Sequence, residues 1–195
     1  MIIALAIAAA EPAMTAIDAE RAFAADAQKL GQWTAFRKYA ADDAEMFVPQ
    51  WVRAHEFLKD KADPPVSVFW WPGKSFVSCD GGTAVNTGPW VRQWGKTVGY
   101  FSTVWKRQAD GGWKWIYDGG DALEAARAEG GDIKPKPASC EGKPFMMPHA
   151  FHSADSTLAW INVTGPDGQR SFFVWLWNGE KYENVISDYF AAPPK

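Results

Sequence analysis

The sequence predicts an α+β domain in which short helices come first and a curled antiparallel sheet follows. Two observations predict this class. Apolar residues recur at helical spacing as far as residue 59, whereas they alternate with a period of two after Pro64 and Pro65. Turn-forming pairs of Gly, Asp and Asn then separate the later segments at the intervals typical of hairpins. With 195 residues, the chain is long enough for one domain with an appendage.

The helices are expected near the N-terminus. Thr15 can cap a helix over residues 15–30, because an apolar stripe at helical spacing follows it and Gly31 ends it. The other elements expected in this region are a helix over residues 33–39, a short strand over 45–48 that Pro49 stops, and a helix over 51–59.

Strands dominate the rest of the chain. A short helix over residues 123–129 and a Pro-rich surface linker over 134–148 divide them into two groups. The expected strands cover residues 66–71, 75–79, 83–92, 97–107, 113–118, 157–164, 171–177 and 181–187.

The composition is that of a folded globular protein rich in aromatic residues. Hydrophobic residues make up 47% and charged residues 22%, which excludes a disordered chain. A net charge of −3 provides no basic surface for nucleic acid. Twelve Trp and twelve Phe exceed what a small core ordinarily needs. These rings either line a cavity or an interface, or fill a sheet packed on both faces, and the sequence leaves both interpretations open.

The first residues suggest export. Residues 1–10 are an apolar run in which Ala8 and Ala10 suit a signal-peptide cleavage site, although no Lys or Arg precedes them. The run is shorter than the roughly 20 apolar residues that a membrane span requires, so membrane insertion is not expected. We therefore expect a periplasmic or secreted protein.

Cys79 and Cys140 are the two cysteines. Two cysteines in an exported protein can form one disulfide, and the alternative is a pair of unlinked thiols. Their separation of 61 positions is not a metal-binding pattern. The sequence does not decide between the two states.

Two local segments resemble a known family. Residues 39–47 (YAADDAEMF) resemble the helix–turn–strand segment of the NTF2-like superfamily, and residues 104–118 resemble the closing hairpin of its SnoaL-like and DUF4440-like members. The resemblance covers about residues 15–121 and implies a cone that opens beside the helices. The expected organisation is a signal-like segment (1–14), an NTF2-like domain (15–121), a helix and Pro-rich linker (122–155), and a C-terminal three-stranded antiparallel segment (156–190) packed on the same domain.

The resemblance also implies which side chains line the cone. Carried over by strand alternation, Phe101, Thr103 and Trp105 point inward from one strand, and Ile116 and Asp118 from the next. The ligand-binding residues expected from these strands and their neighbours are Phe47, Trp51, Trp70, Trp90, Phe101, Thr103, Trp105 and Ile116.

The chemistry of the family's isomerase branch is incomplete in this sequence. Val48 stands where that branch has its carboxylate base, and Thr103 stands where it has an acid. Asp118 is the remaining catalytic candidate, because a carboxyl inside an apolar cone would have a raised pKa. The alternative is a structural Asp118 bonded to turn amides or to a Trp N–H. His55 could pair with Asp118 across the mouth, or simply pack on its helix.

No metal or cofactor site is expected. His149, His152 and Asp155 lie close together in sequence, but their spacing is not that of a zinc site. Nucleotide-binding and hydrolase motifs are also missing from the sequence.

Three functions remain open. The first is a module that binds a hydrophobic or aromatic small molecule, or a partner, in its cone. The second is a SnoaL-type isomerase, dehydratase or hydrolase that uses Asp118. The third is a structural domain with a filled cone, whose C-terminal strands form an assembly surface. A homodimer is expected from the resemblance.

Overall fold

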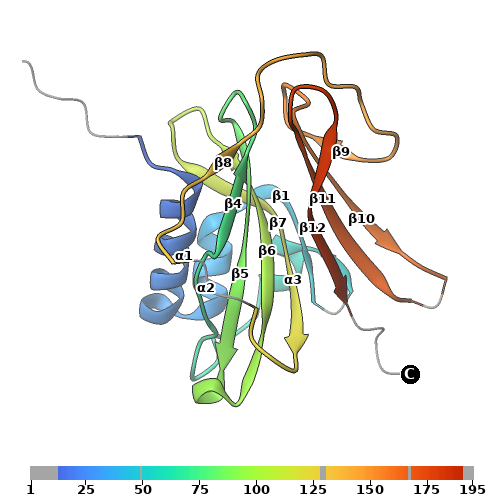
Figure 1. Cartoon of the computed structure of the whole chain (residues 1–195). Helices are drawn as coiled ribbons and strands as arrows, with labels where there is room; N and C mark the ends of the chain where they lie inside the picture. The colour runs from blue at the N-terminus through green and yellow to red at the C-terminus, as the bar shows by residue number, and fades with distance from the viewer. Residues whose placement is uncertain (1–12, 49, 128–130, 167, 191–195) are drawn as a thin grey trace, which may run out of the picture.

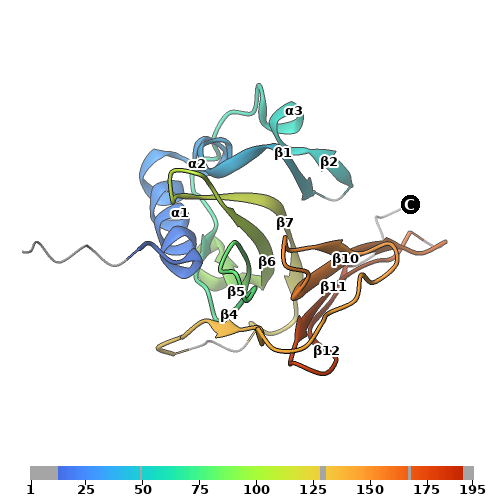
Figure 2. The ribbon, with the colours of Figure 1, turned by 90° about the horizontal axis from the view of Figure 1, so that it is seen from above.

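Three helices lie on one side of a curled sheet, and a second sheet lies on the other side (Figure 1; Figure 2). The computed structural model describes residues 13–48, 50–127, 131–166 and 168–190. The apolar run expected to direct export, residues 1–10, lies outside these ranges. Within them, no helix has the length and apolar character needed to cross a bilayer.

Helix α1 (Ala16–Leu30) begins at the cap that the sequence predicts. The Thr15 hydroxyl accepts the Asp18 amide at 3.2 Å, and the Asp18 carboxylate accepts the Thr15 amide at 3.0 Å. This reciprocal pair satisfies two amides that a helix N-terminus otherwise leaves unbonded. The face of α1 that packs on the sheet consists of Ala16, Ile17, Ala19, Glu20, Phe23, Ala24 and Ala27.

Helix α2 (Gln32–Tyr39) follows after a single residue and takes its cap from a distant loop. The Asp63 carboxylate accepts the amide of Thr34 at 2.9 Å and its hydroxyl at 2.6 Å. Gly31 joins the helices with φ of 107°, and a Cβ at this position would lie 2.3 Å from Asp63 Cγ. Glycine is therefore required both by the backbone angle and by the neighbouring cap.

The cone sheet has the strand order β2-β1-β7-β6-β5-β4-β8, and β3 pairs with β5. Neighbours in the central hairpins are antiparallel, but β1 is parallel to β7 and β4 is parallel to β8. The sheet is therefore mixed, since strands that no tight hairpin joins are free to run in the same direction. Its strands are β1 (Ala40–Phe47), β2 (Trp51–Arg53), β3 (Phe69–Trp70), β4 (Lys74–Val77), β5 (Thr83–Arg92), β6 (Thr97–Arg107), β7 (Trp113–Leu123) and β8 (Lys136–Pro137), with α3 (Ala54–Leu58) and a 3₁₀ turn η1 (Gln93–Gly95) between them.

Strand pairing overrides two of the expected helices. Residues 51–53 pair with β1, so the expected helix over 51–59 is reduced to α3. Strand β7 continues to Leu123 because its pairing with β6 continues that far. The expected helix over 123–129 is therefore wrong: residues 124–127, the part of it that is described beyond the strand, are not helical. Local helix propensity is a weak preference that tertiary pairing can override.

A bulge in β7 reverses one expected orientation. Val104 pairs with Tyr117 and Trp105 pairs with Trp115, which leaves Ile116 without an opposite residue. One extra residue shifts the alternation of a strand. Trp115 consequently faces the cone, whereas Ile116 packs with the side chains outside it. The expectation that Ile116 points inward is wrong for this reason, and Asp118, beyond the bulge, does face the cone.

The second sheet covers the outer face of the cone sheet (Figure 1; Figure 2). One face of β11 supplies Phe172, Val174 and Leu176, which pack with the cone residues Tyr100 and Val104. The Phe172 ring also stacks on Tyr117 at a centroid distance of 4.5 Å. The strand order of this sheet is β12-β11-β10-β9, with β9 (Phe151–His152), β10 (Leu158–Thr164), β11 (Arg170–Trp177) and β12 (Tyr182–Phe190).

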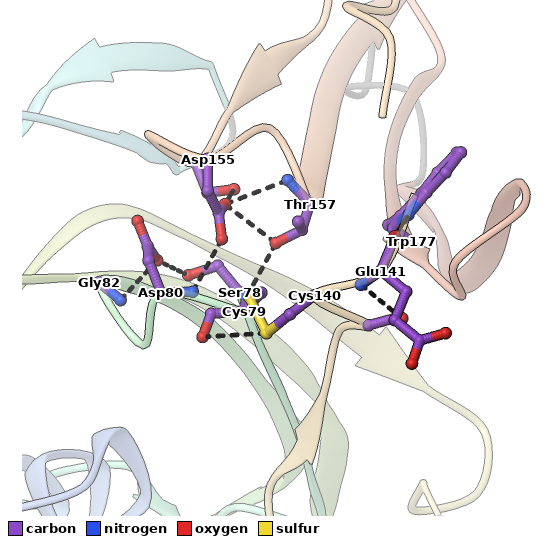
Figure 3. The surroundings of a disulfide bond; sticks show 11 residues. Ser78, Cys79, Asp80, Gly82, Cys140, Glu141, Asp155, Thr157 and Trp177 are labelled. Carbon is purple, nitrogen blue, oxygen red and sulfur yellow. Dashed lines mark hydrogen bonds between the residues drawn. A yellow bond between two sulfur atoms is a disulfide. The ribbon is translucent and has the colours of Figure 1, made fainter. Parts of the chain in front are cut away.

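A disulfide between Cys79 and Cys140 ties the turn after β4 to the segment that leads to the second sheet (Figure 3). The structure thus selects the linked state of the two that the sequence allows. Polar contacts surround it: the Cys79 amide donates to Thr157 Oγ1 at 2.8 Å, and the Asp80 amide donates to Asp155 Oδ2 at 2.8 Å. These contacts anchor the start of β10 to the rim of the cone sheet.

We expect removal of the disulfide to destabilise the protein. The bond joins cysteines 61 positions apart. Closing a loop of that length lowers the conformational entropy of the unfolded chain, which stabilises the folded state by about 4 kcal/mol. Chemical denaturation of a Cys79→Ser/Cys140→Ser variant should show a loss of this order against the oxidised wild type. The difference should disappear when both proteins are unfolded under reducing conditions. Equal stability without reductant would contradict the expectation.

Candidate functional site

The cone contains a cavity of about 360 Å³. Its walls come from α2, from the strands of the cone sheet, and from one residue of the second sheet. The structure therefore does not have the completely filled cone of the third hypothesis. The aromatic part of the wall is Trp33, Phe36, Phe47, Trp70, Trp90 and Phe101, and the polar part is Gln32, Arg92, Thr97, Asp118, Asp121 and Arg170.

The other end of the cone is filled by side chains. Phe23 of α1 packs edge-on against Trp70 at a centroid distance of 4.8 Å and against Trp105 at 6.0 Å. Phe36 lies 6.0 Å from Trp115 in the same arrangement. Edge-to-face contacts at these distances are favourable for aromatic pairs. The many rings of the sequence thus serve both purposes: some fill a core, and others line a cavity.

Glu20 lies beneath the cavity and is completely buried. Its Oε1 accepts the indole N–H of Trp70 at 2.9 Å, and its Oε2 accepts the indole N–H of Trp105 at 2.6 Å. The side-chain amide of Asn86 donates to Oε2 at 3.3 Å. Burial raises the pKa of Glu20 to about 8, against the three hydrogen bonds that lower it, and the charge of Asp118 raises it further.

Sequence reasoning missed Glu20, although a signal was present. The residue occupies the apolar stripe of α1, between Ala16 and Phe23, where a charged side chain is unusual. A buried carboxyl requires donors, and the two tryptophans that supply them are 50 and 85 positions away. The anomaly could have been noticed in the sequence, but its partners could not have been identified there.

Asp118 lies on the cavity wall, as the sequence predicts. Its Oδ2 accepts the hydroxyl of Thr103 at 2.9 Å, and its accessible surface faces the cavity. Burial raises the pKa of Asp118 to about 7, while the bond from Thr103 lowers it. The carboxyl can therefore accept or donate a proton near neutral pH. The inward orientation of both residues follows from strand alternation.

Some expected site residues lie elsewhere. Trp105 is buried in the filled end of the cone, and Trp51 stacks on Tyr117 outside the cavity. His55 is exposed on α3, where its Nε2 contacts the carbonyl of Ala41 at 3.1 Å. The expected pairing of His55 with Asp118 is wrong, because the two side chains face different surroundings. Thr103, also expected to bind the ligand, is fully buried behind Asp118 and does not line the cavity. The expected residues that do line the cavity are Phe47, Trp70, Trp90, Phe101 and Asp118.

Val48 also lines the cavity. This is the position at which the isomerase branch of the resembled family has a carboxylate, so the wall is aliphatic at that point. No group of three or more His, Cys, Asp or Glu residues suited to a metal ion is present in the described ranges. The polar chemistry of the wall therefore depends on Asp118 and on the charged residues at the mouth.

Two arginines and one aspartate stand at the mouth. Arg92 is exposed at the end of β5, with its guanidinium 4.9 Å from the centre of the Trp90 ring. Arg170 is buried at the start of β11, 3.8 Å from the centre of the Phe47 ring, and Asp121 acts on it electrostatically. Sequence reasoning missed Arg170 because it lies beyond the segment that resembles the family.

Comparison with known proteins finds distant similarity in structure and none in sequence families. No family model matches the chain, and no curated protein shows significant sequence similarity to it. Solved structures that are similar include a candidate ketosteroid isomerase from Shewanella frigidimarina, at 17% identity and a TM-score of 0.40, which covers 55% of this chain and 95% of that one. A candidate aromatic ring hydroxylase from Novosphingobium aromaticivorans has 16% identity and a TM-score of 0.38 over 55% of this chain and 85% of that one.

An NTF2-like superfamily protein from Salmonella enterica has 16% identity and a TM-score of 0.39, and covers 60% of this chain and 92% of that one. The order of the elements is the one that the sequence predicts: helices first, then a curled sheet that encloses a cavity. At these identities and scores, the similarity carries no information about activity or ligand.

We expect the stability of the protein to fall as pH rises through the neutral range. Burial raises the pKa of Asp118 to about 7 and that of Glu20 to about 8, above the ordinary values of 3.8 and 4.5. The folded state therefore binds more protons than the unfolded state between these limits. As pH rises over this range, the free energy of unfolding therefore falls by up to about 1.4 kcal/mol per pH unit for each extra proton that the folded state binds.

Asp118→Asn tests this expectation. Asparagine keeps an acceptor for the Thr103 hydroxyl but does not titrate, so the decline in stability between about pH 5 and 7 should become shallower. Denaturation at a series of pH values measures the slope. The exposed Asp60→Asn serves as a control and should follow the wild type. Parallel curves for Asp118→Asn and the wild type would refute the assignment.

Proposed function

We propose that this protein binds a small apolar or aromatic molecule in its cone. The observation that supports the proposal most strongly is the open cavity of about 360 Å³, with aromatic walls and one carboxyl beside a hydroxyl. Small-molecule sites have volumes of about 300–1,000 Å³ and combine apolar walls with a few polar groups. The size favours a ligand of two or three rings, or its aliphatic equivalent.

The cavity wall presents apolar ring surface to a ligand. Trp33, Trp70, Trp90 and Phe101 all present ring surface to the cavity, although the same fold packs rings tightly at its other end. Burial of apolar surface contributes about 25 cal/mol per Å². A ligand that covers these walls would remove this apolar surface from water. Asp118, held in place by the Thr103 hydroxyl, would orient it by hydrogen bonding.

Export is part of the proposal. A disulfide persists in oxidising compartments, and the Cys79–Cys140 bond is consistent with a periplasmic or secreted location. The apolar residues 1–10 support the same inference. Both observations concern the compartment, and neither identifies the ligand.

A homodimer would have to use a surface other than the outer face of the cone sheet. The second sheet covers that face, where Tyr100, Val104 and Tyr117 pack against it. The outward face of the second sheet presents Phe173 and Tyr189, whose ring centroids lie 5.8 Å apart, as a surface for association.

We expect a neutral fluorescent probe, N-phenylnaphthylamine, to bind in the cone with a dissociation constant of the order of micromolar. Ala122 is exposed and lines the mouth, so Ala122→Trp should block entry and weaken binding by about tenfold or more. The next residue, Leu123, is also exposed but is not part of the cavity wall, which makes Leu123→Trp a matched control. Fluorescence titration measures all three affinities. Equal affinities of the two variants would place the probe outside the cone.

A second candidate function is proton transfer by Asp118. The position of this carboxyl on an apolar wall, with a pKa of about 7, favours it as a general base. The carboxylate would remove a proton from carbon or oxygen of a bound substrate, and Thr103 would hold its second oxygen in place. Such a protein would be a SnoaL-type enzyme that uses Asp118 and not His55.

Ring opening of nitrobenzisoxazole tests that alternative without knowledge of the substrate. In this reaction a base removes the ring C–H proton, the N–O bond breaks, and a cyanophenolate is released with no other reactant. We expect a rate that rises with pH around about 7 and falls by about 100-fold or more in Asp118→Asn. A rate equal to that of the control Asp60→Asn would exclude Asp118 as a base and leave the binding proposal intact.

A further inference from the structure

The charges at the cavity mouth restrict the class of ligand. Arg92 ends β5 and pairs with Thr97 across the hairpin to β6, and both residues line the cavity. The guanidinium lies over the ring of Trp90 at 4.9 Å. A guanidinium that stacks on a ring keeps its N–H donors in its own plane, where they remain accessible to another group. None of the ion pairs within the described residues includes Arg92.

The other charged groups at the mouth leave an excess of positive charge. Arg170 contributes a second guanidinium to the wall, and Asp121 contributes one carboxylate. Asp121 acts electrostatically on Arg170, which belongs to β11 of the second sheet. The formal charge of these three side chains is therefore that of one cation, and Arg92 is the exposed one.

The carboxyls deeper in the cone do not reverse this balance. Burial raises the pKa of Asp118 to about 7 and that of Glu20 to about 8, so a substantial fraction of each is neutral at neutral pH. An aromatic cavity with an ionised carboxylate would favour an organic cation. Below about pH 7 the deep carboxyls are mostly uncharged, and the exposed charge at the entrance, that of Arg92, is positive.

We propose that the ligand is an amphipathic organic acid, whose apolar body lies between the aromatic walls and whose carboxylate binds Arg92 at the mouth. This inference depends on the proposed binding function and names the chemical class of its ligand. Guanidinium and carboxylate match in a two-point, charge-assisted hydrogen bond. The neutral end of the ligand would lie near Asp118, where an apolar group or a single hydrogen-bonding group fits.

Three probes with the same apolar body test the proposal: naphthylacetate, naphthylacetamide and naphthylethylamine, which carry a negative, a neutral and a positive group. Calorimetric titration at low salt and about pH 6, where Asp118 is mostly protonated, measures their affinities for the intact protein. We expect the acid to bind about tenfold more tightly than the amide, and the amine to bind most weakly. The preference for the acid should shrink at about 0.5 M salt, because screening weakens a solvent-exposed ion pair.

Arg92 variants locate the charge. Arg92→Gln should reduce the affinity for the acid to that for the amide and leave the amide unchanged, and Arg92→Glu should shift the preference toward the amine. Arg107→Gln is a matched control, because Arg107 also lies 4.9 Å from a tryptophan ring, that of Trp113, but outside the cavity. It should bind all three probes as the wild type does.

The outcomes separate the two proposals. If the wild type bound amide and acid equally, or preferred the amine, the acid assignment would be overturned while binding in the cone would stand. If none of the three probes bound, both proposals would fail. An equal loss of acid affinity in Arg92→Gln and Arg107→Gln would also overturn the assignment, since it would show that the effect does not arise at the mouth.

Discussion

The burial of one carboxyl, Glu20, organises the cone. Its two oxygens receive the indole N–H groups of Trp70 and Trp105 and the amide of Asn86, and so connect α1 to β3, β6 and β5. A buried carboxyl without donors would be strongly destabilising, and a buried indole N–H also needs a partner. Each group therefore requires the others. These hydrogen bonds fix the distance between α1 and the cone sheet, and they fix the orientation of Trp70, whose ring lines the cavity.

The position of Trp70 determines where the core ends and the cavity begins. Its indole is held from below by Glu20, while its ring contacts Phe23 and Phe36 and also lines the cavity. Side chains on the Glu20 side are closely packed rings, and those on the other side are the walls of an open space. The same boundary keeps Asp118 away from bulk water, which raises its pKa toward neutrality.

The second sheet is both a cover and a contributor to the site. It buries the outer face of the cone sheet, and its polar anchors include Asp188, which accepts the hydroxyl of Ser102 at 2.6 Å and pairs with Arg127 at 2.5 Å. It also brings Arg170 to the cavity. The mouth of the cone thus depends on residues far apart in sequence, and its charge would be different without the C-terminal part of the chain.

The sequence by itself determined the elements that depend on neighbours in the chain. The bounds of β5 and β6 match the expected ranges, since turns and alternation define a hairpin locally, and the cap at Thr15 needs only Asp18. Alternation also placed Thr103 and Asp118 on the inside. Tertiary structure decided the bulge that turns Ile116 outward, the extension of β7 to Leu123, the partners of Glu20 and the position of Arg170 at the mouth. Each of these depends on a strand or side chain distant in sequence, and periodicity carries no information about such partners.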